Sequence, residues 1–263
     1  MIDTVMSVCG DRQYYDMAEY SIPCFLRENA GSKLTVFSDE PERLSHIVGE
    51  FKNHLSVLDF NRSLDRLTGK RVLYANAIME NVNEPWEHHG MEHVHKYVAL
   101  LPVLAEEYTT QPFILKIDVD SWFKGDMLIK VIGRLIEQYS LTDTFSDVYL
   151  VNRPDNGIIK TFGNEWPGVG FLLWPRGFKF VEQYSTLFNG NEQETILVKL
   201  CHERKVSLKT FGDWHWHTVY PWIKAEETGV PFNESDLPEP YYIHIHASHA
   251  REKLEELYRK NYG

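Results

Sequence analysis

Apolar residues in this sequence gather in short continuous runs that lack the three- to four-residue spacing of a helix. Such runs, ended by turn residues, are typical of strands that are buried on both faces of a sheet. The first run is TVMSVC, and Gly10-Asp11 ends it. The pattern predicts strands at Thr4–Cys9, Leu34–Phe37, Leu55–Phe60, Phe113–Asp118, Val148–Val151, Gly168–Trp174, Val206–Phe211 and Tyr241–His246.

Helical spacing of apolar residues begins between these runs. It predicts a helix over Tyr14–Glu28, which Pro23 is expected to kink or divide in two. Ser38 or Asp39 is predicted to cap the next helix, which has Pro41 early in its first turn. Further helices are predicted at Met91–Tyr108, interrupted or bent near Pro102, at Asp126–Tyr139, Phe178–Phe188 and Asn191–Arg204, and from Ser248 onward.

The N-terminal order of strand, helix, strand, helix and strand predicts an α/β fold. Right-handed crossovers would then give a parallel sheet of the nucleotide-binding type. At 263 residues the chain is long enough for one large α/β unit or two small domains, and no change of composition marks a linker between domains.

Charge and cysteine content narrow the possible partners and the compartment. The formal net charge is −11, from 38 acidic and 27 basic residues, which argues against nucleic acid or an anionic membrane as the main partner. Three widely spaced cysteines fit reduced core residues of an intracellular protein. The sequence has no signal peptide and no transmembrane segment, so we expect a soluble, cytoplasmic chain unless it is a fragment of something larger.

The strand that begins at Phe113 ends in an Asp-x-Asp motif, Asp118-Val119-Asp120. Residues two apart on a strand share a face, so the two carboxylates could bind one divalent cation through oxygen ligands. Ligands of open α/β folds sit at the carboxyl ends of the strands, where a cation would be well placed for phosphates. The alternative is an ordinary strand end with Asp120 or Ser121 capping the next segment.

A second candidate site is the segment YYIHIHASH near the C-terminus. His244 and His246 alternate with isoleucines, so both imidazoles are predicted on one face of a strand, where either could complete the cation site. The alternative is that they are surface or core histidines in a chain that holds 12. Ser248 begins a helix whose free N–H groups could hold a diphosphate.

Together, the N-terminal βαβ half, the Asp-x-Asp motif and the C-terminal histidine segment resemble the GT-A glycosyltransferases. The similarity is to the retaining kind typified by glycogenin and bacterial lipooligosaccharide galactosyltransferases. It implies one domain with a mixed, mostly parallel sheet flanked by helices. Residues 1–125 would form the nucleotide-sugar half and residues 126–263 the acceptor half with the metal-binding histidine.

The resemblance also implies the ligands. Mn²⁺ (or Mg²⁺) would be held by Asp118, Asp120 and His244. The resemblance places His244 at the ligand position because Ala247 matches the small residue three positions after the family's histidine. His246 is the reserve candidate. The cation would bridge the diphosphate of a UDP-sugar.

Further nucleotide contacts are implied at Cys9, Gly10 and Asp11, at Tyr14 or Tyr15, and at Lys96 and Val119. Tyr14 could equally be a core residue of its helix, and Lys96 a solvated lysine. The family's Lys-Pro-Trp after the metal histidine is missing, so His249 or Arg251 would replace that lysine as a phosphate ligand.

The segment GNEQETIL resembles the family's acidic element beside the donor sugar and implies that Glu192 and Gln193 lie near the anomeric carbon. Alternatively, Asn191 and Glu194 form a capping box. The aromatic segment DWHWHTVYPW could line a sugar site or be buried in the ordinary way, and Asp213 is a candidate base if the enzyme inverts configuration.

The expected activity is metal-dependent transfer of a sugar from a nucleotide-sugar, most simply a UDP-sugar, to a saccharide or glycoconjugate acceptor, with retention of configuration. Three alternatives remain: an inverting GT-A transferase, a metal-dependent hydrolase that uses the histidine pair, and a non-catalytic carbohydrate-binding protein.

Overall fold

The computed structural model describes residues 2–82, 86–88, 91–93, 95–125, 147–152, 167–177, 180–190, 196–197, 199–200, 207–210, 215–217, 242–245 and 247–263. Only the backbone is described at 86–88, 91–93, 95, 147–152, 167–169, 207–210, 215–217, 242–244 and 247–249.

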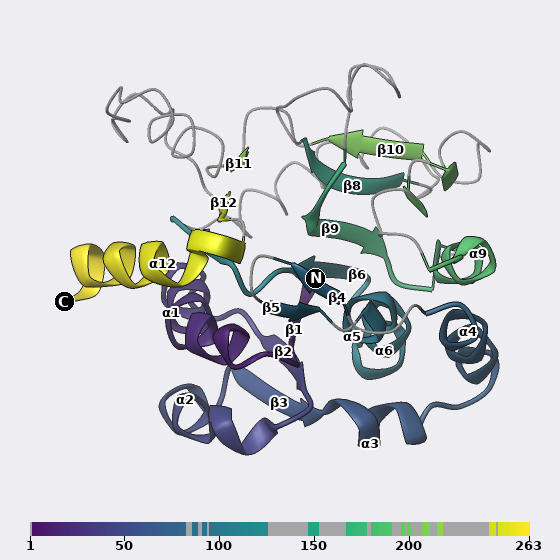
Figure 1. Ribbon diagram of the computed structural model, residues 1–263, viewed down its shortest axis with the longest axis horizontal. Helices are drawn as coiled ribbons and strands as arrows, with labels where there is room; N and C mark the ends of the chain where they lie inside the picture. The colour runs from purple at the N-terminus through teal and green to yellow at the C-terminus, as the bar shows by residue number, and fades with distance from the viewer. Residues whose placement is uncertain are drawn as a thin grey trace.

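A seven-stranded sheet runs through the molecule in the order β10-β8-β9-β6-β1-β2-β3 (Figure 1). Strand β9 is antiparallel to both neighbours, and the other adjacent pairs are parallel. The predicted mixed, mostly parallel sheet is therefore confirmed. The strands are β1 (Ile2–Val8), β2 (Leu34–Ser38), β3 (Leu55–Asp59), β6 (Phe113–Ile117), β8 (Asp147–Asn152), β9 (Pro167–Pro175) and β10 (Ser207–Thr210).

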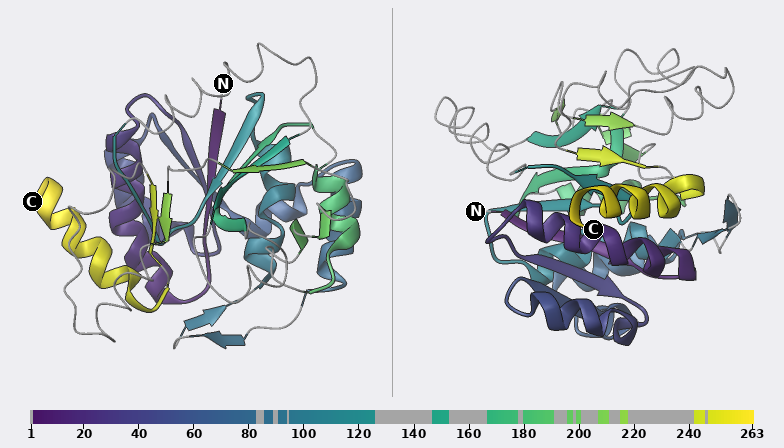
Figure 2. Two further views of the ribbon diagram at one scale, coloured as in Figure 1. Left: turned by 90° about the horizontal axis from the view of Figure 1, so that it is seen from above. Right: turned by 90° about the vertical axis from the view of Figure 1, so that its left-hand side faces the viewer.

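Helices cover both faces of this sheet and give three layers (Figure 2). One face carries α1 (Arg12–Glu28), α2 (Ser45–Phe51) and α12 (Ala247–Tyr262). The other carries α4 (Lys70–Met79), α5 (His95–Ala99), α6 (Leu101–Tyr108) and α9 (Phe180–Leu187). The 3-10 helix η1 (Pro41–Leu44) precedes α2, and α3 (Phe60–Asp65) follows β3.

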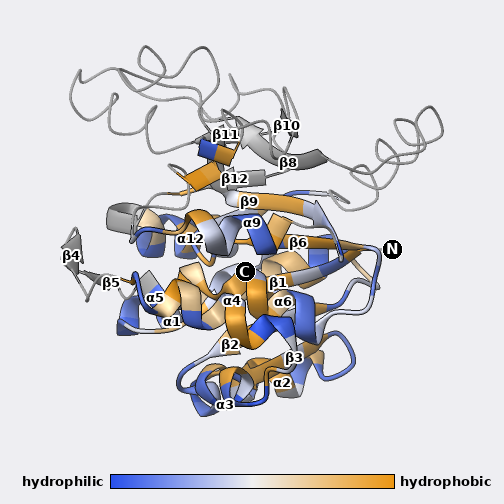
Figure 3. Cartoon of the chain, turned by 90° about the vertical axis from the view of Figure 1, so that its right-hand side faces the viewer, coloured by the Kyte–Doolittle hydropathy of each residue, from blue (hydrophilic) through white to orange (hydrophobic). Residues whose placement is uncertain are grey.

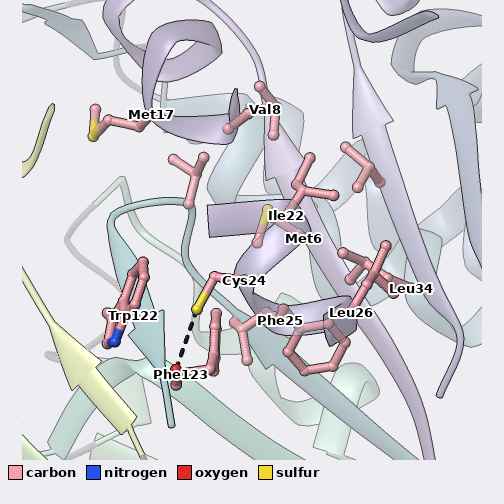
Figure 4. Close-up of a cluster of buried hydrophobic side chains, with 14 of the residues drawn as sticks. Met6, Val8, Met17, Ile22, Cys24, Phe25, Leu26, Leu34, Trp122 and Phe123 are labelled. Atoms are coloured by element: carbon pink, nitrogen blue, oxygen red, sulfur yellow. Dashed lines mark hydrogen bonds between the residues drawn. The ribbon is translucent and has the colours of Figure 1, made fainter. Parts of the chain in front are cut away.

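Two hydrophobic clusters fill the spaces between the layers, and β6 separates them. Leu115 and Ile117 belong to the cluster that contains α1 and α12, whereas Ile114 belongs to the cluster that contains α5, α6 and α9. This is the alternation of side chains along a strand. Figure 4 shows part of the first cluster, where the Cys24 thiol donates a hydrogen bond to the Phe123 carbonyl (3.1 Å).

Two smaller sheets lie beside the main one. The first has the order β11-β12-β7, with β7 (Ser121–Phe123) antiparallel to β12 (Tyr242–His244), and β12 parallel to β11 (His215–His217). The second is a hairpin of β4 (Trp86–His88) and β5 (Met91–His93).

The structure corrects part of two predictions about helices. The first residues of the predicted helix over residues 91–108 form strand β5. The interruption predicted near Pro102 is confirmed, because α5 ends at Ala99 and α6 begins at Leu101. Pro102 lies in the first turn of α6, where its missing N–H costs no helical hydrogen bond. Helix α1 runs through Pro23 and is not divided in two.

Candidate functional site

The Asp-x-Asp motif lies directly after β6, at the carboxyl end of the main sheet. The Asp118 N–H donates to the Gly170 carbonyl (3.0 Å), so the pairing of β6 with β9 extends to the first aspartate. Val119 is buried in the cluster of α1 and α12, whereas Asp118 and Asp120 are half-buried. The buried valine fixes the backbone between two carboxylates that remain partly accessible.

A buried lysine accompanies the motif. Lys116 lies on β6, and its Nζ is 2.6 Å from Oδ1 of Asp118. The lysine side chain is 1% exposed and that of Asp118 is 29% exposed, so the ion pair reaches from the interior to the edge of the sheet. Sequence reasoning missed Lys116, because a single lysine in an apolar strand gives no signal of its partner.

The C-terminal strand is hydrogen-bonded to the residues around Asp120. In the antiparallel pair of β7 and β12, His244 lies opposite Ser121. The next N–H, that of Ile245, donates to the Asp120 carbonyl (2.7 Å), and the Ile245 side chain is fully buried. On the other side of β12, His217 of β11 lies opposite His244. The backbone thus brings together two predicted parts of the site that are far apart in sequence.

The loop after β1 is held by Asp39, at the end of β2. Gly10 has φ +88°, which favours glycine, and its N–H points to both carboxylate oxygens of Asp39 (3.2 and 3.1 Å). The Tyr15 hydroxyl donates to Oδ1 of Asp39 (2.5 Å). Asp39 therefore fixes the β1–α1 loop, and Glu40, not the predicted Ser38 or Asp39, is the N-cap residue of η1.

Two other residues of this loop have local partners. The Asp11 carboxylate accepts a hydrogen bond from the Gln13 N–H (2.8 Å) and caps α1. The Cys9 thiol points inward and donates to the Phe37 carbonyl (3.4 Å), and burial raises its pKa to about 12. Any contact of Cys9 with a nucleotide would therefore come from its backbone.

Tyr14 lies in the first turn of α1, next to this loop, and is the aromatic residue there that is associated with the Asp-x-Asp motif. Burial raises its pKa above the usual range, and the negative charges of Asp120, Asp118 and Asp11 raise it further. The phenol therefore keeps its proton at neutral pH and can donate a hydrogen bond. Three carboxylates near one hydroxyl make this edge of the sheet acidic.

The remaining basic candidates lie on α5 and α12. Lys96 has its Nζ 4.9 Å from the centroid of the Tyr97 ring. Arg251 forms an ion pair with Asp16 of α1 (3.4 Å). For His249, the structure describes only the backbone, which lies in the first turn of α12.

Several predicted site residues lie outside the described part of the chain. They are Glu192, Gln193, Asp213 and His246, together with the side chain of His244. Within the described residues, no group of three or more histidine, cysteine, aspartate or glutamate side chains could hold a metal ion. The metal-ligand roles of the two aspartates and the histidines stay predictions. Among the same residues, no helix is both long and apolar enough to cross a lipid bilayer.

Comparison with solved structures identifies the fold. Mouse xyloside xylosyltransferase 1 superposes with a TM-score of 0.59 at 12% identity, over 93% of this chain and 98% of that one. The galactosyltransferase LgtC, solved with donor and acceptor sugar analogues, superposes with a TM-score of 0.55 at 10% identity, over 99% of this chain and 96% of LgtC. The glycosyltransferase GlyE of Streptococcus pneumoniae superposes with a TM-score of 0.55 at 15% identity, over 97% of this chain and 59% of GlyE.

This chain has the GT-A fold. The resemblance to GT-A glycosyltransferases is thereby confirmed at the level of the fold, since identities this low carry no further. No protein-family model matches the sequence, and no curated protein is significantly similar to it. Function in this GT-A chain must therefore be argued from its own residues.

Proposed function

We propose that this GT-A chain is a metal-dependent glycosyltransferase that moves a sugar from a UDP-sugar to a saccharide or glycoconjugate acceptor. The observation that carries the proposal is the meeting of the Asp-x-Asp motif with the C-terminal strand, through the hydrogen bond from Ile245 to Asp120. Both stretches were predicted to form one cation site, and the solved structures with this fold include a galactosyltransferase and a xylosyltransferase.

The proposed metal ligands suit a hard divalent cation. Two half-buried carboxylates at one strand end supply the oxygen ligands that Mn²⁺ and Mg²⁺ prefer, and His244 is the proposed third ligand. When bound there, the cation would supply Lewis-acid stabilisation of the charge that develops on the diphosphate leaving group. Without it, the carboxylates around Tyr14 would repel a diphosphate.

The chain's own residues would orient the donor. The protonated Tyr14 can donate a hydrogen bond, and the β1–α1 loop is fixed by the contact of Gly10 with Asp39. Lys96 and His249 remain proposed nucleotide contacts. Glu192 and Gln193 are proposed beside the donor sugar, and retention of configuration is proposed because no base is then needed besides the leaving phosphate.

Calorimetric titration with UDP and Mn²⁺ tests the cation site. Wild-type protein should bind UDP more tightly with Mn²⁺ than without it, and Asp120→Ala should remove that difference. Asp65→Ala is the matched control, because Asp65 is exposed on α3. Equal UDP affinity of wild type and Asp120→Ala in Mn²⁺ would refute the assignment.

The donor and the reaction need a second experiment. A panel of nucleotide-sugars is screened by thermal unfolding with and without Mn²⁺, because a bound ligand raises the melting temperature by mass action. The stabilising donor is then incubated with saccharide acceptors. A new glycosidic product supports a transferase, whereas phosphate release without glycoside formation would support the hydrolase alternative.

A further inference from the structure

Lys116 is the only buried basic side chain in the part of the chain that the structure describes. It lies on β6, which ends at Ile117, so both aspartates of the motif follow directly after the strand that carries this lysine. Its ammonium contacts the first carboxylate of the Asp-x-Asp motif at 2.6 Å. The ion pair is thus part of the edge where the cation is proposed to bind.

Burial of this ammonium needs an explanation other than stability. Removing an ammonium from water costs several kcal/mol, and a buried ion pair often contributes no more to stability than apolar residues of the same volume. The neighbours of Lys116 on β6, Leu115 and Ile117, are apolar and fully buried. A methionine at position 116 would continue that pattern without any cost of burying charge.

The charge of Lys116 acts directly on the proposed cation site. It cancels one of the two formal negative charges of the aspartate pair, and it repels a divalent cation at short range. It also fixes the carboxylate of Asp118, as partners of metal ligands commonly do. A diphosphate, in contrast, is attracted by the same ammonium.

We propose that Lys116 is a positioning residue that makes tight cation binding depend on the nucleotide. Mn²⁺ alone binds weakly because Lys116 offsets the carboxylates. Mn²⁺ with a nucleoside diphosphate binds tightly because the added negative charge restores the balance. This inference rests on the proposed function, and it adds that the cation and the donor diphosphate enter as a coupled pair.

The coupling is measured by titrating the protein with Mn²⁺ and following free Mn²⁺ by electron paramagnetic resonance, with and without UDP. In wild type, UDP should raise the Mn²⁺ affinity by about tenfold or more, within the usual range of coupling between sites. In Lys116→Met, Mn²⁺ alone should bind about tenfold more tightly, and UDP should add little. In this variant Mn²⁺ is no longer repelled by the lysine ammonium, although Asp118 is no longer held in place by it. The first effect should be larger, because the repulsion acts on a cation with two charges.

Two controls separate charge from structure. Lys116→Arg keeps the positive charge and should keep the dependence on UDP. Lys253→Met removes a lysine that is ion-paired with Glu256 on α12, and should behave as wild type. Equal Mn²⁺ affinity with and without UDP in wild type overturns the inference even if Lys116→Met does not fold.

The outcomes also distinguish this inference from the proposed function. If wild type shows the coupling but Lys116→Met binds Mn²⁺ alone no more tightly than wild type, only the role of Lys116 is wrong. If wild type binds neither UDP nor Mn²⁺ in any combination, the proposed function fails and the role of Lys116 fails with it.

Discussion

Ile245 connects the hydrophobic core to the proposed cation site, which makes Ile245→Ala an informative perturbation. Its side chain is fully buried in the cluster of α1 and α12, and its N–H donates to the Asp120 carbonyl. It directly follows His244, the proposed third ligand. Truncating it should therefore affect both stability and cation binding.

The stability cost follows from burial. Ile245→Ala removes three buried carbon groups at about 0.8 kcal/mol each, and the cavity left behind adds to this loss, so the free energy of unfolding should fall by about 3 kcal/mol. For a chain of this size the melting temperature should then fall by about 6–12 °C. Urea denaturation followed by tryptophan fluorescence measures the change directly.

Leu254→Ala is the control that separates the loss of Mn²⁺ binding from the loss of stability. Leu254 is also fully buried in the same cluster, but it lies on α12 and takes no part in the pairing of β7 with β12. Both variants should lose similar stability. Only Ile245→Ala should weaken Mn²⁺ binding in the presence of UDP, by about tenfold. Equal weakening in the two variants, or a stability loss below about 1 kcal/mol for Ile245→Ala, would refute the reasoning.

Two further predictions concern the β1–α1 loop and the buried thiols. Gly10→Ala should lower the free energy of unfolding by about 1–2 kcal/mol, because the residue has φ +88°. Gly49→Ala, in α2 and with nothing within 4 Å of an added Cβ, should raise it by about 0.5–1 kcal/mol, and thermal unfolding compares the two. Burial raises the pKa of Cys9 to about 12 and that of Cys24 above its usual range, so iodoacetamide at pH 8 should label both only in urea. Rapid labelling of folded protein, located by peptide mass spectrometry, would contradict this.

The sequence predicted the central strands because they are buried on both faces. Residues 113–117 form a nearly continuous apolar run, and β6 is buried throughout. Helix α4 was missed for the opposite reason. Its apolar residues do not gather on one face, since Ala75 and Ile78 are buried whereas Leu73 is 64% exposed and Met79 is 45% exposed. The colours of Figure 3 show the hydrophobic residues of this helix. The sequence of α4 therefore lacks the pattern of an amphipathic helix.

The contacts between residues far apart in the sequence could not be predicted, because no local sequence pattern encodes them. Strand β7 is three residues long and is defined by its pairing with β12, near the C-terminus. Asp39 is separated by 29 residues from Gly10, which it fixes. The Asp-x-Asp motif could be recognised from its own spacing at the end of an apolar run, whereas Lys116 has meaning only through its contact with Asp118.

The charges at the carboxyl edge of the sheet bear on the order of ligand binding. Asp11, Asp118 and Asp120 all act on the Tyr14 hydroxyl, in a chain that already carries a net charge of −11. A diphosphate arriving alone would meet this negative field, whereas a divalent cation arriving alone would be attracted less strongly than the carboxylates alone would allow, because Lys116 offsets one of them. Each ligand therefore favours the binding of the other, because their charges are opposite. The charges of this edge therefore support the proposed dependence on metal by an argument that does not use the fold.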